Sequence, residues 1–177
     1  MKVSPFAASI MGLMGPLVVV QAYAEVYMTE AAAASSLFPD QKWEQKTLEL
    51  TPDEIKKIEQ ASGQDVRGAS LKYFKDSLGD LVFIDQVLGK HEFITYAVGI
   101  SPDGQVKGIE VIEYRETYGQ KVREAPWRAQ FIGKNKTSNL KIGDDIKNIS
   151  GATLSSAHIT TGVKRMIQTY ETIRPRI

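Results

Sequence analysis

The chain has 177 residues, of which 42% are hydrophobic and 24% are charged, so it is long enough for one domain with a core of its own. A formal net charge of +1, with no prominent run of Lys and Arg, excludes a general electrostatic attraction to nucleic acid. Because there is no cysteine, disulfides, thiolate metal sites and covalent haem attachment are excluded as well.

The first 24 residues have the pattern of a secretory signal peptide. Lys2 gives a positive start, residues 6–20 are mostly apolar and small, and residues 22–24 form the cleavage signal Ala-Tyr-Ala. The apolar run is shorter than the roughly 20 residues that span a bilayer, and Pro16 interrupts it. We therefore predict cleavage after Ala24 and a periplasmic or otherwise extracytoplasmic location. An uncleaved N-terminal membrane anchor is the alternative.

Residues 25–69 are predicted to form an N-terminal extension of helices and a strand. The second helix has a complete start signal, with Thr51 as N-cap, Pro52 at the first helical position and Glu54 closing a capping box. The expected elements are a helix over 29–37, a strand over 43–50 and a helix that runs from 51 to about 61 and ends at Gly63.

Residues 70–177 are predicted to form the main domain, and its first half is rich in strands. The residues Ser101-Pro102-Asp103-Gly104 make a tight turn, so the strands on either side are expected to pair as a hairpin. Four strands are bounded by Gly, Asp or Pro turn signals, over 70–76, 80–88, 92–101 and 105–115. A mainly antiparallel sheet is the expected result.

The rest of the chain is predicted to contain a short helix over 123–131, a long surface loop over 133–148 and a last helix over 156–172. The apolar residues of the last helix recur at helical spacing, which indicates a face that packs on the core: Ile159, Val163, Met166, Ile167 and Tyr170. The predicted fold class is therefore α+β, a mainly antiparallel sheet with packed helices in a single domain.

The segment that opens the last helix, residues 150–156, has the sequence Ser-Gly-Ala-Thr-Leu-Ser-Ser. Gly151 and Ala152 have no bulky side chain, so a phosphate can approach the backbone N–H groups at the helix start. Thr153 places a hydroxyl nucleophile in the same stretch, and Ser155 and Ser156 can cap the helix or bind phosphate oxygens. A plain small-residue loop that caps a helix is the alternative interpretation.

Three stretches together resemble the FMN-binding domain family. This family includes the C subunit of the sodium-translocating NADH:quinone oxidoreductase, the G subunit of the Rnf complex and small secreted flavoproteins. The three stretches are the strand pair 92–115, the loop Glu116-Thr117-Tyr118-Gly119-Gln120 and the segment Ser150-Gly151-Ala152-Thr153-Leu154-Ser155-Ser156. The resemblance covers roughly residues 70–165. It implies that the domain binds FMN and that Thr153 carries the cofactor through a phosphoester bond.

The resemblance also implies where the cofactor-binding residues lie. Around the phosphate, Thr153 is expected together with Ser150, Gly151, Ala152, Leu154, Ser155 and Ser156. At the edge of the isoalloxazine ring, the candidates are Glu116, Thr117, Tyr118 and Gly119, for which a turn at the end of a strand is the alternative. Trp127 is interpreted as a core residue rather than a ring-stacking one. His91 and His158 form no ligand-spaced pair, so no metal site is predicted.

One position departs from the family pattern. The family usually has an acidic residue three positions before the serine, and this chain has Lys147 there. Two outcomes stay open: FMN is held without a covalent bond, or Lys147 pairs with the flavin phosphate or with the negative charge of the reduced ring. Lys147 is therefore counted among the candidate cofactor-binding residues.

The function implied by the resemblance is an extracytoplasmic flavoprotein that carries electrons between membrane-associated or periplasmic redox proteins. A magnesium-dependent flavin transferase is its implied maturation partner. The sequence has no Gly-x-Gly-x-x-Gly nicotinamide motif and no evident general acid/base pair, which favours an electron carrier over a complete enzyme. A secreted binding or assembly module of the same fold without flavin is the alternative, and a flavin reductase is a third hypothesis.

Overall fold

The computed structural model describes residues 25–177, so the predicted signal peptide lies outside the described part. The strands are β1 Glu25–Val26, β2 Glu44–Glu49, β3 Ser70–Lys75, β4 Leu81–Leu88, β5 Phe93–Ile100 and β6 Val106–Tyr114. The helices are α1 Glu30–Leu37, α2 Pro52–Ser62, α3 Ala125–Arg128 and α4 Thr153–Ile173, with short 3-10 turns η1 Gln120–Arg123, η2 Ala129–Phe131 and η3 Arg174–Arg176.

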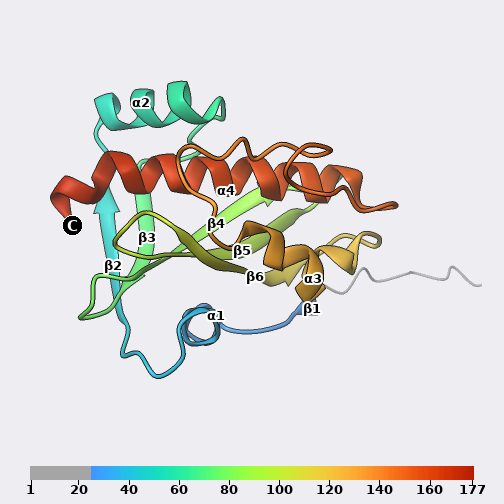
Figure 1. Ribbon diagram of the computed structural model, residues 1–177, viewed down its shortest axis with the longest axis horizontal. Helices are drawn as coiled ribbons and strands as arrows, with labels where there is room; N and C mark the ends of the chain where they lie inside the picture. Colours follow the sequence, from blue (N-terminus) through green and yellow to red (C-terminus); the bar gives the residue numbers. More distant parts are fainter. Residues whose placement is uncertain (1–24) are drawn as a thin grey trace, which may run out of the picture.

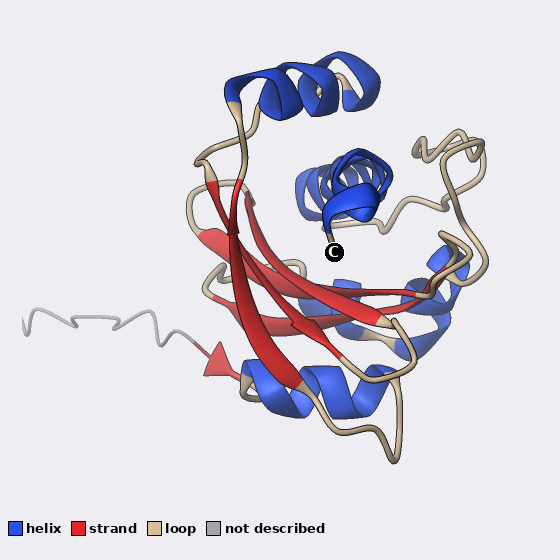
Figure 2. Ribbon diagram, turned by 90° about the vertical axis from the view of Figure 1, so that its left-hand side faces the viewer, coloured by secondary structure: helices blue, strands red, loops and turns tan. Residues whose placement is uncertain are grey.

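In this described part, all six strands form one antiparallel sheet, in the order β1-β6-β5-β4-β3-β2. The long helix α4 lies along one face with α2 beside it, and α1 covers the opposite face (Figure 1). The sheet curves around α4, which Figure 2 shows nearly end-on. The predicted fold class, an α+β single domain with a mainly antiparallel sheet, is confirmed.

The predicted strands and helices are found close to their expected bounds, with three differences. β1 was not predicted, because two residues carry no periodic signal, yet Glu25 and Val26 pair with the end of β6. The expected helix over 123–131 is a succession of short helical turns. The last helix begins at Thr153, three residues earlier than predicted, so the small-residue segment itself forms its first turn.

The main core lies between α4 and the sheet. All five residues of the predicted apolar stripe of α4 are buried there, as the helical spacing indicated. At Gly162 the helix comes so close to the sheet that a Cβ atom would collide with the Tyr96 hydroxyl and with Val87. A glycine is therefore needed at this crossing. On the other face, Ala33 and Ala34 of α1 pack in a smaller cluster.

The sheet has a gap between two of its strands. β3 and β4 pair only from Tyr73–Phe83 to Lys75–Leu81, and they then separate. Residues 70–72 and 84–86 line the resulting cavity, whose volume is about 290 Å³. This opening lies beside the middle of α4, where Arg165, Met166 and Thr169 complete its wall.

A buried charge network lies beside this cavity. Arg165 of α4 donates to Asp85 Oδ2 at 2.6 Å, and Tyr96 donates its hydroxyl to the same oxygen. Burial opposes the charge on Arg165, but the Asp85 carboxylate raises the pKa of the guanidinium above its ordinary value. Arg165 is therefore charged at neutral pH, and its hydrogen-bond partners are all within the protein.

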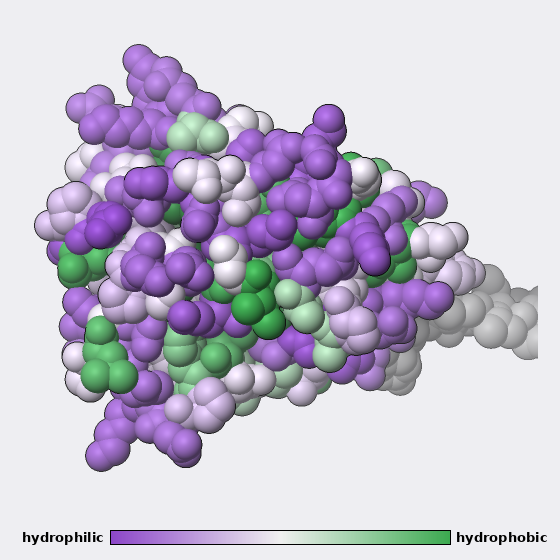
Figure 3. All heavy atoms as spheres, viewed as in Figure 1, coloured by the Kyte–Doolittle hydropathy of each residue, from purple (hydrophilic) through white to green (hydrophobic). Residues whose placement is uncertain are grey.

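The surface over α2 and α4 is mostly hydrophilic, with apolar residues scattered between charged ones (Figure 3). Within residues 25–177, no helix combines the length and the apolar character that crossing a bilayer requires.

Candidate functional site

The first turn of α4 offers backbone N–H groups that no capping side chain satisfies. The N-cap residue is Ala152, with φ −134° and ψ 28°, and it makes no side-chain cap hydrogen bond. Gly151 before it has φ +83°, a left-handed conformation that favours glycine. A helix N-terminus of this kind attracts an anion, because the free N–H groups and the helix dipole both favour negative charge.

A second segment, residues 116–119, is held against this helix start by Tyr114. The Tyr114 hydroxyl donates to the carbonyl oxygen of Tyr118 at 2.6 Å and lies 3.0 Å from Ser155 Oγ. Burial raises the pKa of Tyr114 above its ordinary value, so the hydroxyl keeps its proton at neutral pH. One buried group at the end of β6 thus joins the two segments that the sequence singled out.

Gly119 allows this close approach. Its φ of +98° is in the left-handed region, and a Cβ atom there would collide with the Tyr114 hydroxyl. The same Cβ would lie 3.1 Å from the Cβ of Ala152. The loop can therefore lie against the start of α4 because this position has no side chain.

Glu116 ties the same loop to the turn between β4 and β5. Its carboxylate accepts hydrogen bonds from the backbone N–H groups of His91 at 2.5 Å and Glu92 at 3.1 Å. Burial alone would raise the pKa of Glu116, but these backbone donors outweigh it and lower the pKa below its ordinary value. The turn, the loop and the helix start are thus fixed relative to one another.

These three segments enclose a cavity of about 520 Å³. Its volume falls within the range of roughly 300–1,000 Å³ that is typical of small-molecule and cofactor sites. Two large apolar side chains stand at its edge, Tyr118 with 81% of its surface exposed and Leu154 with 47%. The cavity is lined by Lys90, His91, Glu116, Thr117, Tyr118, Gly151, Ala152, Thr153, Leu154 and Ser155.

Most of the residues predicted from the sequence line this cavity, and four do not. Gly119 ends the loop of residues 116–119, and it lies against Tyr114 and Ala152 instead. Ser150 is exposed in the turn before the helix. Ser156 is fully buried, and its hydroxyl lies 2.9 Å from Asn148 Oδ1 and 3.1 Å from the carbonyl oxygen of Thr153.

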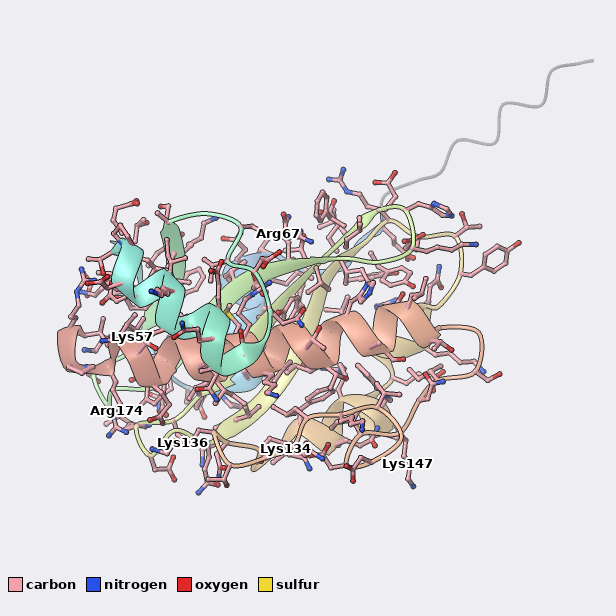
Figure 4. All side chains as sticks on the ribbon, turned by 90° about the horizontal axis from the view of Figure 1, so that it is seen from above. Lys57, Arg67, Lys134, Lys136, Lys147 and Arg174 are labelled. Carbon is pink, nitrogen blue, oxygen red and sulfur yellow. The ribbon has the colours of Figure 1, made fainter. Side chains whose placement is uncertain are left out.

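Lys147 is the fourth predicted residue that does not line the cavity. Its side chain points away from the start of α4 (Figure 4). Its backbone is fixed instead, because its N–H donates to Gln130 Oε1 at 2.8 Å and its carbonyl accepts the indole N–H of Trp127 at 2.8 Å. Trp127 is buried, in agreement with its interpretation as a core residue.

Sequence reasoning missed four residues of this site. Lys90 and His91 line the cavity from the turn after β4, and Tyr114 lies beneath it. Asn148 donates from Nδ2 to the hydroxyl oxygen of Thr153 at 3.2 Å. The short distance in sequence between Asn148 and Thr153 was the one available signal, because the other three reach the site through strand pairing.

Comparison with known proteins shows what the part of the chain around this site is similar to. Residues 89–168 match the model of the FMN-binding domain family, and both segments of the site fall within that range. The G subunit of the Na⁺-translocating ferredoxin:NAD⁺ oxidoreductase complex of Acetobacterium woodii is 33% identical over 84 residues, which are 42% of this chain and 41% of that protein. The match thus spans about two fifths of the relative.

Among solved structures, NqrC of Shewanella oneidensis is similar over 80% of this chain and 86% of its own, with a TM-score of 0.55 and 16% identity. At that identity the likeness concerns the fold alone. The family match is carried by the sequence from the β4–β5 turn to the middle of α4. Residues 89–168, which contain both segments of the site, are thus similar to the FMN-binding domain family.

Proposed function

We propose that this protein is an extracytoplasmic electron carrier that holds FMN in the cavity at the start of α4, linked to Thr153 through a phosphoester bond. The observation that carries the proposal is the position of Thr153. Its hydroxyl stands at the first position of an uncapped helix, on the wall of a cavity of about 520 Å³, within the segment that matches the family.

The residues present fit the cofactor. The N–H groups of the first turn and the small residues Gly151 and Ala152 would receive the phosphate. Glu116, Thr117 and Tyr118, with Lys90 and His91 of the adjoining turn, would surround the ring. The exposed side chains of Tyr118 and Leu154 supply apolar surface for it. When bound, the isoalloxazine ring supplies reversible uptake of electrons, and the protein orients it and tunes its potential.

The role of carrier is supported by the sequence and by the relative from Acetobacterium woodii. That protein belongs to a redox complex, so redox proteins at a membrane are the partners that we propose here. Residues 1–24 have the pattern of a signal peptide, which supports a location beyond the cytoplasmic membrane, reached by cleavage after Ala24 or with the segment kept as an anchor.

Attachment of the flavin needs a second protein. A threonine hydroxyl does not react with FAD on its own, so we propose a magnesium-dependent flavin transferase as the maturation partner. The exposed position of Thr153 leaves its hydroxyl accessible to such an enzyme.

Intact-mass spectrometry tests this proposal. The purified full chain is incubated with FAD, Mg²⁺ and a flavin transferase, and it is expected to gain the mass of one FMN. Thr153→Val removes the acceptor and should gain nothing. Thr161→Val, two turns further along α4 and outside the cavity, should load like the wild type. A wild-type chain without added mass, or an unchanged adduct in Thr153→Val, contradicts the attachment.

A denaturing gel separates the remaining hypotheses. Covalent flavin survives boiling in detergent and fluoresces in the band, whereas FMN held without a bond is lost. A chain that is colourless before the gel and non-fluorescent on it would support the flavin-free module, and nicotinamide oxidation by the isolated protein would support a reductase.

A further inference from the structure

The side-chain amide of Asn148 is held by three groups around the start of α4. Its Oδ1 accepts the backbone N–H of Ile149 at 2.8 Å and lies 2.9 Å from the Ser156 hydroxyl oxygen. At the other end of the amide, Nδ2 lies 3.2 Å from Thr153 Oγ1. The side chain of the neighbouring Lys147 points away from the start of α4, whereas that of Asn148 forms a hydrogen bond with the Thr153 side chain.

These contacts decide which way the amide faces. A backbone N–H can only donate, so the end of the amide that meets Ile149 must be the oxygen. The NH₂ group therefore faces Thr153, and Thr153 Oγ1 is the acceptor of that hydrogen bond. It follows that the hydroxyl hydrogen of Thr153 is directed away from Asn148.

The other threonines of α4 show the usual arrangement. Thr160 and Thr169 donate their hydroxyl hydrogens to carbonyl oxygens one turn earlier, at 2.7 Å from Ser156 and 2.9 Å from Arg165. Such back-bonding within a helix occupies the hydrogen. Thr153 is at the first helical position, and it receives a hydrogen bond from Asn148 where those residues donate one.

We propose that Asn148 is a positioning residue for the attachment of flavin to Thr153. This inference rests on the proposed function. In the transfer, Thr153 Oγ1 bonds to the FMN-side phosphorus of FAD, the bond from that phosphorus to the bridging oxygen breaks, and AMP leaves. The hydroxyl hydrogen passes to a base of the transferase, and nothing is oxidised or reduced. Asn148 holds Oγ1 in one rotamer with its hydrogen turned outward.

A double-mutant cycle tests this inference through the initial rate at which FMN mass appears on the chain. Asn148→Ala should load about fivefold more slowly than the wild type, the effect expected from one hydrogen bond between neutral groups. In a Thr153→Ser background the same change should cost more, because serine lacks the methyl group that restricts χ1. A purely structural role would give the same ratio in both backgrounds.

Asn139→Ala is the matched control. This exposed asparagine lies in the same loop and contacts Asp144, so its loss should leave the rate within about twofold of the wild type, less than one hydrogen bond is worth. Equal rates for wild type and Asn148→Ala, or an equal ratio in both backgrounds, with the wild type fully loaded, overturn the inference alone. A wild type that gains no flavin mass overturns the proposed attachment and the inference with it.

Discussion

Two of the cavities beside α4 differ in the hydrogen-bonding and charged groups that line them. In the cavity between β3 and β4, of about 290 Å³, four charged wall residues form two ion pairs, Asp85 with Arg165 at 2.6 Å and Glu30 with Lys72 at 2.9 Å, and Arg67 lies over the ring of Phe93. The cavity at the start of α4 has a helix N-terminus without a side-chain cap. The two cavities thus differ in the groups that line them, since the first is lined mainly by paired charged side chains and the second by backbone N–H groups that no side chain caps.

The largest effect is expected in the first cavity. Asp85→Ala would leave the Tyr96 hydroxyl without its acceptor and the buried Arg165 guanidinium without a counter-charge, with only carbonyl oxygens as partners. Breaking a buried pair from one side costs about 3–5 kcal/mol, so the free energy of unfolding in urea should fall by that amount. Flavin loading of the folded fraction should be unchanged.

The control for Asp85→Ala is Glu44→Ala, which breaks the exposed pair with Lys46. It should cost less than about 1 kcal/mol. Equal costs for the two variants would show that the first cavity is not held together by its charge pair, and the contrast between the cavities would be lost.

An intermediate effect is expected where the loop meets the helix. Gly119→Ala must keep a φ of +98° and also displace the Tyr114 hydroxyl, so it should cost about 2–3 kcal/mol in unfolding experiments. It should also slow flavin attachment, because both walls of the cavity move. Gly133→Ala also has a left-handed φ, of +78°, but no atom within 4 Å, so only the backbone cost of about 1 kcal/mol is expected. Similar losses for both would contradict the close contact.

The smallest effect on stability is expected from removing a single tyrosine hydroxyl, and it gives the most direct comparison between the two ends of α4. Tyr114→Phe removes the hydroxyl that joins Tyr118 and Ser155, and Tyr170→Phe removes one that donates to Pro102 at the far end of α4. Each should lower stability by about 1 kcal/mol, the worth of a typical hydrogen bond. Tyr114→Phe alone should also slow attachment of FMN, measured by intact mass. Equal rates for the two variants would mean that the hydroxyl does not organise the site.

Much of the fold could be predicted because its signals are local. The Ser101–Gly104 turn forms between paired strands, and the capping box of Thr51 and Glu54 is present at the start of α2. The start of α4 was placed too late for a physical reason. Its N-cap is Ala152, which has no capping side chain, whereas the serines that follow have the usual capping chemistry.

The candidate site could be predicted only in part, because only some of its residues belong to local sequence motifs. Thr153 and Tyr118 belong to contiguous segments, so a motif can reveal them. Lys90, His91 and Tyr114 come to the site through the pairing of β4, β5 and β6, and that register depends on every cross-strand contact of the sheet. No short stretch of sequence carries this information.

The exposed apolar side chains beside the larger cavity give the proposed loading of FMN a second consequence. Tyr118 and Leu154 are exposed to solvent, and in the proposed site the isoalloxazine ring would cover them. Under this proposal, the chain without FMN would expose more apolar surface than the chain with FMN, and hydrophobic-interaction chromatography should retain it longer. Loading of the coenzyme would in this way also reduce the exposed apolar surface of the protein.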